Sequence, residues 1–490
     1  MLQTASIAPA PIPFLIGGEP VRGEAVFQSV NPATGQVNYE VSVASSADVD
    51  RCVAVAQEAA RAPKWRNMKP HERARILYAI AEGMMARADV LAQIQMRENG
   101  KVMAECRAQV ASASSTFRYY AAVCETLGAE VTPSRGDYLS MTLHQPYGVV
   151  AAITPWNSPL TMEAQKVAPA LAAGNAVIVK PSEVTPTAAL EVADIALAAG
   201  LPPGILNVLT GTGRDTGLPL VRHPGVRMIS FTGGTETGRT IGRIAAERLV
   251  PVALELGGKS PNILFADADL EAAVAGVVTG IFEGSGQSCI AGSRLFVQRA
   301  VLDEVVGRLK ARTQALRVGQ PDVAGMSMGP LSSFGHRERV EGFVADARAA
   351  GGEILAGGAR PEDPALDAGA FYMPTLVAGL TSAARVCREE IFGPVLCILP
   401  FDDEDDLVAQ ANDTAYGLAC GIWTADYKRA LRVARAIDAG TVWVNTYKQL
   451  SISTPFGGFK DSGIGREKGI GGMRLYQQAK SIYLGLDATA

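Results

Sequence analysis

Two patterns of apolar residues divide the chain near residue 147. Before that point, apolar residues return at helical spacing, as in Ile76, Ile80 and Met84, within a segment rich in Ala, Arg and Glu. We therefore expect two to four helices between residues 46 and 125.

After residue 147, short β-branched runs alternate with Ala-rich helical stretches, and a second segment of this kind runs from residue 257 to about 460. Strands and helices that alternate at this interval are typical of parallel βαβ units in a doubly wound α/β sheet. The predicted strands are GVVAAIT (148–154), AVIVK (176–180), ILNVLT (205–210), RMISF (227–231), VALEL (252–256), NILF (262–265), SRLFVQ (293–298), VLCILP (395–400) and TVWVN (441–445).

Length and charge narrow the class of protein. The 490 residues correspond to roughly three folded units at about 150 residues each. A net charge of −4, with 48% hydrophobic and 19% charged residues, is typical of an ordinary globular protein. Such a chain lacks the clustered positive charge that nucleic acids or anionic membranes attract, so we expect neither partner.

Two charge-free stretches resemble export or membrane signals but lack their features. No Lys or Arg precedes Arg22, and prolines interrupt the first 18 residues, so we expect a loose leader and not a secretory signal. Prolines and polar residues also interrupt residues 138–162, which excludes a transmembrane helix there.

Seven cysteines and four histidines are too widely spaced for a zinc cluster or a disulfide framework, so we expect no metal and a cytoplasmic location. One cysteine, Cys289, lies in the Gly- and Ser-rich run Gly284-Ser-Gly-Gln-Ser-Cys-Ile-Ala-Gly292. Flexible backbone there could bring the thiol and its N–H against a ligand, although a buried, inert thiol is the common alternative.

Three other polar residues stand at strand ends or turns. Glu255 lies near the end of VALEL, which two glycines follow. Lys180 ends AVIVK, and Asn157 lies between prolines in TPWNSP. Each has an ordinary interpretation as a solvated carboxylate, a solvent-facing cation or a turn residue.

Two Gly-rich turns each follow a predicted strand. Gly211-Thr-Gly213 misses the dinucleotide-binding fingerprint by one residue, and FTGGTETG (231–238) places small residues at a helix start. Either could be a plain turn or a phosphate-binding turn.

Taken together, these segments resemble the aldehyde dehydrogenase superfamily from about residue 12 to 487. The matching blocks, in order, are PWN (155–157), KPSE (180–183), FTGGTETG (231–238), LELGGK (254–259), GQSC (286–289), EEIFGPV (389–395) and PFGGFKDSGIGRE (455–467).

The resemblance implies a doubly wound NAD(P)-binding domain, an α/β catalytic domain and a small β oligomerisation flap in a homodimer or homotetramer. The expected boundaries are 1–127 and 147–256 for the NAD(P)-binding domain, 257–460 for the catalytic domain, and 128–146 and 474–488 for the oligomerisation segments.

The resemblance also implies catalytic roles. Cys289 would be the nucleophile, Asn157 with the Cys289 N–H would form the oxyanion hole, and Glu255 would be the general base, while Lys166 and Glu467 would form a proton relay. An aldehyde releases hydride only after a nucleophile has made its carbon tetrahedral, and the resulting thioester needs an activated water.

The implied cofactor is NAD, with NADP possible, because a carboxylate at Glu183 would repel a 2′-phosphate. Lys180 and Glu183 would hold the adenosine ribose, and Glu390 and Phe392 the nicotinamide ribose side. The other residues implied at the cofactor are Thr154, Pro155, Trp156, Ser182, Gly213, Phe231, Gly233, Gly234, Gly238, Leu256 and Gly257.

The expected substrate is a small-molecule aldehyde, which Glu255 would help convert to the free acid without coenzyme A. The positions implied for the substrate tunnel are Ser158, Thr161, Met162, Gln165, Leu450 and Phe456. This tunnel should be roomy and polar, which suits polar or ring-containing aldehydes, including semialdehydes. The alternatives are an NADP-preferring semialdehyde dehydrogenase and a non-catalytic binding or structural relative.

Overall fold

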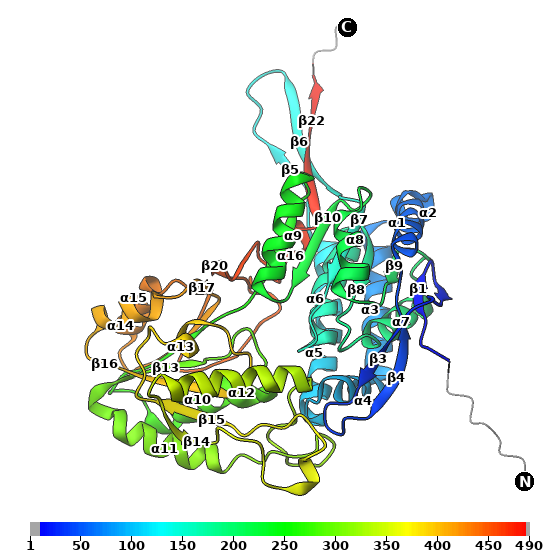
Figure 1. Cartoon of the computed structure of the whole chain (residues 1–490). Coiled ribbons are helices and arrows are strands. Elements are labelled where there is room, and N and C mark those ends of the chain that lie inside the picture. The colour runs from blue at the N-terminus through cyan, green and yellow to red at the C-terminus, as the bar shows by residue number, and fades with distance from the viewer. Residues whose placement is uncertain (1–9, 487–490) are drawn as a thin grey trace, which may run out of the picture.

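The computed structural model describes residues 10–486. Residues 1–9 of the expected leader and first domain, and residues 487–488 of the expected second oligomerisation segment, lie outside the described residues. Figure 1 shows two α/β lobes side by side, with a narrow β-sheet extending away from them.

The first lobe contains an eight-stranded sheet in the order β2-β1-β9-β8-β7-β10-β11-β21. The five central strands, β9, β8, β7, β10 and β11, are parallel to one another. Strands β1, β2 and β21 pair antiparallel at the edges. The bounds are β1 Phe14–Ile16, β2 Glu19–Val21, β7 Val149–Ile153, β8 Ala176–Lys180, β9 Leu206–Val208, β10 Met228–Thr232, β11 Val252–Glu255 and β21 Gly463–Ile464.

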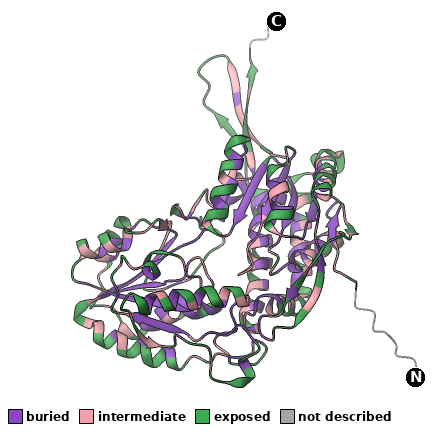
Figure 2. Ribbon diagram, in the orientation of Figure 1, coloured by how far each residue is buried: buried purple, intermediate pink, exposed green. Residues whose placement is uncertain are grey.

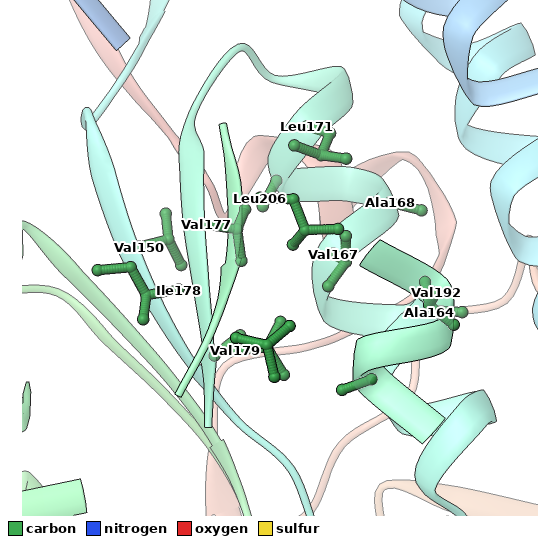
Figure 3. Packing of buried hydrophobic residues seen from close by; sticks show 14 of the residues in the cluster. Val150, Ala164, Val167, Ala168, Leu171, Val177, Ile178, Val179, Val192 and Leu206 are labelled. Atoms are coloured by element: carbon green, nitrogen blue, oxygen red, sulfur yellow. The ribbon is translucent and has the colours of Figure 1, made fainter. Parts of the chain in front are cut away.

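Helices cover this sheet and share one large core with it. Figure 3 shows valine and isoleucine side chains of β7 and β8 packed against apolar residues of the neighbouring helices, among them Val167 and Leu171 of α6. The helices of this lobe are α1 Ser46–Arg61, α2 Pro63–Arg66, α3 Pro70–Ala86, α4 Ala88–Asn99, α5 Met103–Thr126, α6 Pro159–Ala172, α7 Ala188–Ala198, α8 Leu218–Arg222 and α9 Thr235–Glu247.

The second lobe contains a seven-stranded sheet in the order β14-β15-β16-β13-β12-β18-β19, with only β14 antiparallel. One face packs on α10 and α11, and the other on α12, α14 and α15. The bounds are β12 Pro261–Leu264, β13 Arg294–Gln298, β14 Glu353–Ala356, β15 Thr375–Ala378, β16 Val395–Phe401, β18 Ala419–Trp423, β19 Thr441–Val444, α10 Leu270–Phe282, α11 Leu302–Gln314, α12 Phe334–Ala349, α13 Arg385–Arg388, α14 Glu404–Asn412 and α15 Tyr427–Ala436.

Three smaller sheets and the short helix α16 lie outside the two large sheets. Strands β5, β6 and β22 form a three-stranded antiparallel sheet that projects from the first lobe, and its outer part is largely exposed (Figures 1 and 2). The remaining bounds are β3 Val26–Val30, β4 Val37–Ser42, β5 Glu130–Thr132, β6 Tyr138–Pro146, β17 Tyr416–Gly417, β20 Phe459–Lys460, α16 Gly469–Arg474 and β22 Gln477–Gly485.

The predicted fold class is confirmed, and every predicted strand lies within two residues of an observed one. Two expectations were wrong. The first 18 residues are not all a loose leader, because Phe14–Ile16 form the buried strand β1 between β2 and β9. Residues 46–125 lie in five helices and not two to four, because Pro63 starts the additional one-turn helix α2 after an extended Ala62. The domain boundaries stay a prediction.

The strand order of the first lobe determines where a binding crevice lies. The chain passes from β7 outward through β8 and β9, then returns to β10 on the other side of β7. Such a reversal opens a crevice outside the carboxyl ends of the two strands, where doubly wound sheets bind ligands. Trp156 and Asn157 follow β7, and Gly233 and Gly234 follow β10, so these residues meet at the crevice.

Candidate active site

A cavity of about 670 Å³ lies where the first lobe's crevice faces the second lobe. Its walls include Asn157, Glu255 and Cys289, which are far apart in the sequence, together with Glu467. Eight predicted cofactor positions also line it: Pro155, Trp156, Gly233, Gly234, Leu256, Gly257, Glu390 and Phe392.

Left-handed backbone shapes the loop that carries Cys289. The 3-10 turn Glu283–Gly286 after α10 contains Gly284, Ser285 and Gly286 at φ +67°, +57° and +71°. A non-glycine residue rarely adopts this conformation, and the Ser285 hydroxyl stabilises it by donating to the Gly329 carbonyl at 2.9 Å. The loop can therefore turn back into the cavity before β13 begins.

Gly258 allows the Cys289 loop to approach the end of β11. A Cβ atom at residue 258 would lie 2.3 Å from the Cys289 carbonyl oxygen, so only glycine permits this packing of the two backbones. Glu255 lies three residues earlier, at the end of β11. Glycine at 258 is thus one reason why the thiol and this carboxylate share a cavity.

The surroundings of Cys289 favour the thiol over the thiolate. Burial raises its pKa to about 12, and the nearby Glu390 and Glu255 carboxylates contribute in the same direction. A thiolate is the reactive form of cysteine, so the thiol needs a proton acceptor or a cation before it can attack a carbonyl carbon.

Glu255 is buried, and neither carboxyl oxygen has a hydrogen-bond partner among the described residues. Burial, followed by repulsion from Glu467, raises its pKa well above the ordinary value. A carboxyl group in this state can take up a proton near neutral pH, as a general base must. The alternative of a solvated strand-end carboxylate is wrong for this residue.

Behind Glu255 lies a buried polar chain. Glu467 Oε1 and Lys166 Nζ are 2.5 Å apart, and Lys166 also donates to the Ser230 hydroxyl at 3.1 Å. The Tyr476 hydroxyl donates to the same serine at 3.0 Å. Lys166 does not line the cavity, so it can act there only through Glu467.

Asn157 is oriented by the loop that carries the thiol. Its Nδ2 donates to the Gln287 carbonyl at 2.9 Å, two residues before Cys289. Gln287 in turn accepts from the Ser332 backbone N–H at 2.8 Å, which fixes that loop to the second lobe. An amide held beside the thiol in this way can donate to an oxygen that becomes negative there.

The two Gly-rich turns differ in position. Gly234 caps the 13-residue helix α9 without a side-chain bond, and a Cβ there would meet nothing within 4 Å. Free N–H groups at such a helix start suit a phosphate group. Gly213, in contrast, begins a short π-helix (Gly213–Gly217) that lies outside the cavity.

Lys180 is buried and not a solvent-facing cation. Its Nζ lies 3.4 Å from Glu183 Oε2, and burial lowers the pKa of Lys180. The Glu183 carboxylate is half exposed, at 50% of its side-chain area. The other predicted cofactor positions outside the cavity wall are Thr154, Ser182, Phe231 and Gly238, which lie on or beside β7, β8, β10 and α9.

All six predicted tunnel positions line the same cavity. Sequence reasoning missed several other residues of its wall, which the strand and motif patterns do not single out: Gln109, Thr116, Glu283, His336, Arg339, Lys448 and Lys468. Lys468 had one available signal, since it directly follows Glu467.

The described residues contain no cluster of side chains suited to hold a metal ion. None of the helices in residues 10–486 combines the length and apolar character that a membrane span requires.

The fold and the cavity together define an α/β enzyme with a cysteine and a buried carboxylate beside a nucleotide-type crevice. The model of the aldehyde dehydrogenase family matches residues 20–482. The chain therefore belongs to the aldehyde dehydrogenase family and is an NAD(P)-dependent enzyme of that class.

Solved structures agree with this assignment. A Burkholderia cenocepacia protein assigned as an aldehyde dehydrogenase is 40% identical, with 98% of this chain and 99% of that chain covered and a TM-score of 0.96. An aldehyde dehydrogenase from Bacillus cereus, solved with NAD⁺, is 38% identical, with 98% and 97% covered and a TM-score of 0.95. Betaine aldehyde dehydrogenase from Staphylococcus aureus, also solved with NAD⁺, is 35% identical, with 98% and 96% covered and a TM-score of 0.96.

Proposed function

We propose that this protein oxidises an aldehyde to the free carboxylic acid with NAD, through a thioester on Cys289 that a Glu255-activated water hydrolyses. The observation that carries the proposal is the convergence of Cys289, Asn157 and Glu255 on one cavity at the sheet's crevice. The NAD⁺ complexes of the two relatives support the choice of cofactor.

The proposed cofactor residues suit a dinucleotide. The open start of α9 at Gly234 would receive the diphosphate, and Lys180 with Glu183 would hold the adenosine ribose. Gly257 lies directly against Glu390, since a Cβ there would lie 2.5 Å from a Glu390 carboxyl oxygen. Glu390 is held at 2.9 Å by the Gly258 N–H and could accept from a ribose hydroxyl.

The first chemical step is addition of the Cys289 sulfur to the aldehyde carbon, with loss of the thiol proton to solvent. The carbonyl oxygen becomes negative as the S–C bond forms, and the Asn157 amide with the Cys289 N–H would stabilise it. A bound nicotinamide would supply the hydride acceptor, and loss of hydride from the adduct would leave a thioester on Cys289. Glu255 would then remove a proton from the water that cleaves the thioester.

Glu467 and Lys166 could carry that proton away. Glu467 is close enough to Glu255 to raise its pKa, and it is ion-paired with Lys166 in a buried site. A proton taken up by Glu255 could therefore pass to Glu467 while the Lys166 ammonium compensates the remaining charge.

Oligomerisation is proposed through the projecting sheet of β5, β6 and β22. Val131, Tyr483 and Leu486 expose 70%, 66% and 63% of their surfaces on or next to these strands. Large apolar side chains exposed on a projecting sheet suit contact with a second copy, in a homodimer or homotetramer. The seven free cysteines are consistent with the cytoplasmic location expected for the protein.

The direct test is oxidation of a panel of aliphatic, aromatic and carboxylate-bearing aldehydes, followed by absorbance of the reduced nicotinamide. We expect turnover with NAD, a free acid as product without coenzyme A, and kcat/KM at least about tenfold lower with NADP, because Glu183 repels a 2′-phosphate. Equal or better turnover with NADP would favour the semialdehyde dehydrogenase alternative. No turnover with any panel member would contradict the proposed function.

A second prediction concerns Asn157. Replacement by aspartate should lower kcat by about 10²- to 10³-fold, because it removes an N–H donor and places a negative charge beside the developing oxyanion. The measurement is steady-state kinetics with the best panel aldehyde. Exchange of the exposed Asn67 for aspartate is a control for the charge change alone. An Asn157→Asp rate within threefold of the wild type would contradict the assigned role.

A further inference from the structure

Lys468 is a buried cation in the cavity for which the proposed chemistry has no use. It lies between Glu467 and α16, exposes 7% of its surface and lines the cavity. Its Nζ is 5.2 Å from the centre of the Phe456 ring, another residue of the cavity wall. Within residues 10–486 this ammonium has no hydrogen bond and no ion pair.

The two other cations of the cavity wall are occupied. Lys448 donates to the Thr279 carbonyl at 3.2 Å and pairs with Glu283 at 3.4 Å. Arg339 donates to the Glu390 carbonyl at 2.9 Å. Among the described cations that line the cavity, only Lys468 keeps all three donors free.

A second donor without a partner lines the same cavity. Gln165 lies in the middle of α6 and exposes only 5% of its surface, yet its amide bonds to no group among residues 10–486. The Gln165 amide and the Lys468 ammonium are not among the enclosed polar atoms of the described residues, so a molecule in the cavity can reach both. An ammonium and an amide that both lack partners therefore point to a ligand that supplies acceptor oxygens.

The backbone at Lys468 also indicates a functional constraint. Its φ is +62° with ψ 175°, a conformation that favours glycine and is costly for a lysine. Strained residues of this kind cluster at binding and catalytic sites. The strained residue is thus also one that lines the cavity.

The charge around Lys468 favours its protonated form, although burial opposes it. Burial lowers the pKa of Lys468, whereas Glu467, Cys289 and Glu255 raise it. Lys468 also lines the cavity that contains Cys289 and Glu255, so its ammonium lies near the proposed reacting atoms. An acceptor group on a molecule bonded to Cys289 could therefore reach it.

We propose that Lys468, with Gln165, binds a carboxylate of the substrate, so that the preferred substrates are aldehydes that carry this anionic group. A charge-assisted bond between an ammonium and a carboxylate is roughly twice as strong as a neutral one. A neutral aldehyde would leave the ammonium buried and without an acceptor, which is unfavourable. This inference rests on the proposed function and specifies its substrate class.

The test compares matched substrates that differ in charge. 4-Oxobutanoate and 4-formylbenzoate are each paired with their neutral methyl esters, and the ratio of kcat/KM for acid over ester is measured with NAD. We expect a ratio of at least about 10 for the wild type. Lys468→Met should lower the ratio by about 10- to 100-fold, mainly by raising KM for the acids.

Conservative and control variants complete the test. Lys468→Arg should restore most of the ratio, Gln165→Leu should lower it by a smaller factor, and Lys310→Met, on the exposed face of α11, should leave it unchanged. Thermal unfolding shows whether each variant is folded. If Lys468→Met does not fold, the acid-to-ester ratio of Gln165→Leu is the test.

The outcomes separate this inference from the proposed function. A wild-type ratio of 1 or less, or a ratio that Lys468→Met and Gln165→Leu do not change, would overturn carboxylate recognition while aldehyde oxidation stands. A parallel loss for acid and ester in Lys468→Met, with a shifted pH profile, would instead identify Lys468 as a partner of Glu255 and also overturn it. If no aldehyde of the panel is oxidised, the proposed function itself is wrong.

Discussion

Replacing Cys289 by serine is expected to lower aldehyde-dependent reduction of NAD by at least about 10³-fold. A serine hydroxyl is a much weaker nucleophile than a thiolate, and the cavity already disfavours ionisation at this position, since burial raises the Cys289 pKa to about 12. No other residue of the described cavity wall offers a thiol. The initial rate of NADH formation at saturating aldehyde measures the effect.

Cys124 provides the matched control for this substitution. Its Sγ donates to the Pro70 and Ala172 carbonyls, each at 3.4 Å, so a serine hydroxyl can replace the thiol there. Cys124→Ser should keep the wild-type rate. If Cys289→Ser also keeps it, the assignment of the nucleophile is wrong.

Replacing Glu255 by glutamine should separate the two half-reactions. Acylation of Cys289 would still produce NADH, but without a base the thioester would be hydrolysed about 10²- to 10⁴-fold more slowly. We therefore expect a burst of about one NADH per site and then a slow steady state. Stopped-flow absorbance resolves these two phases.

The pH dependence gives an independent check on Glu255. Only its deprotonated form can accept a proton, and burial and Glu467 raise its pKa well above the ordinary value. The wild-type steady-state rate should therefore rise with pH above the range in which an ordinary glutamate titrates, and Glu255→Gln should lose this rise. Glu247→Gln, on the exposed face of α9, should retain both the rate and the rise. If the Glu255→Gln protein forms NADH at the wild-type steady-state rate and shows no burst, this role for Glu255 is wrong.

Much of the fold could be predicted because its strands are continuous apolar runs. AVIVK is fully buried as β8, and nothing in such a run competes with the strand signal. β1 was missed because three apolar residues among prolines have no period of their own, and their burial depends on β9, almost 200 residues later. Helix α2 is a single turn, too short for a periodic pattern.

The candidate site was predictable only where several motifs agree. Cys289, Glu255 and Asn157 each had an ordinary alternative, and the resemblance of ordered blocks decided between them. The burial of Glu255 was not predictable in the same way, because a glutamate at a strand end can equally be solvated. The packing of Gly258 against the Cys289 carbonyl shows why Glu255 is enclosed. Lys468 was missed because its significance lies in the absence of a partner, which a sequence does not record.

The most direct test of the account is the mass of the trapped enzyme. Glu255→Gln protein is mixed with NAD and an aldehyde that the wild type oxidises, quenched in acid after the burst and analysed by intact and peptide mass spectrometry. The account predicts a mass increase equal to the acyl group, located on the peptide that contains Cys289 and absent from the Cys289→Ser/Glu255→Gln double variant. Formation of the acid while Cys289 stays unmodified, or an acyl group on a different residue, would contradict it.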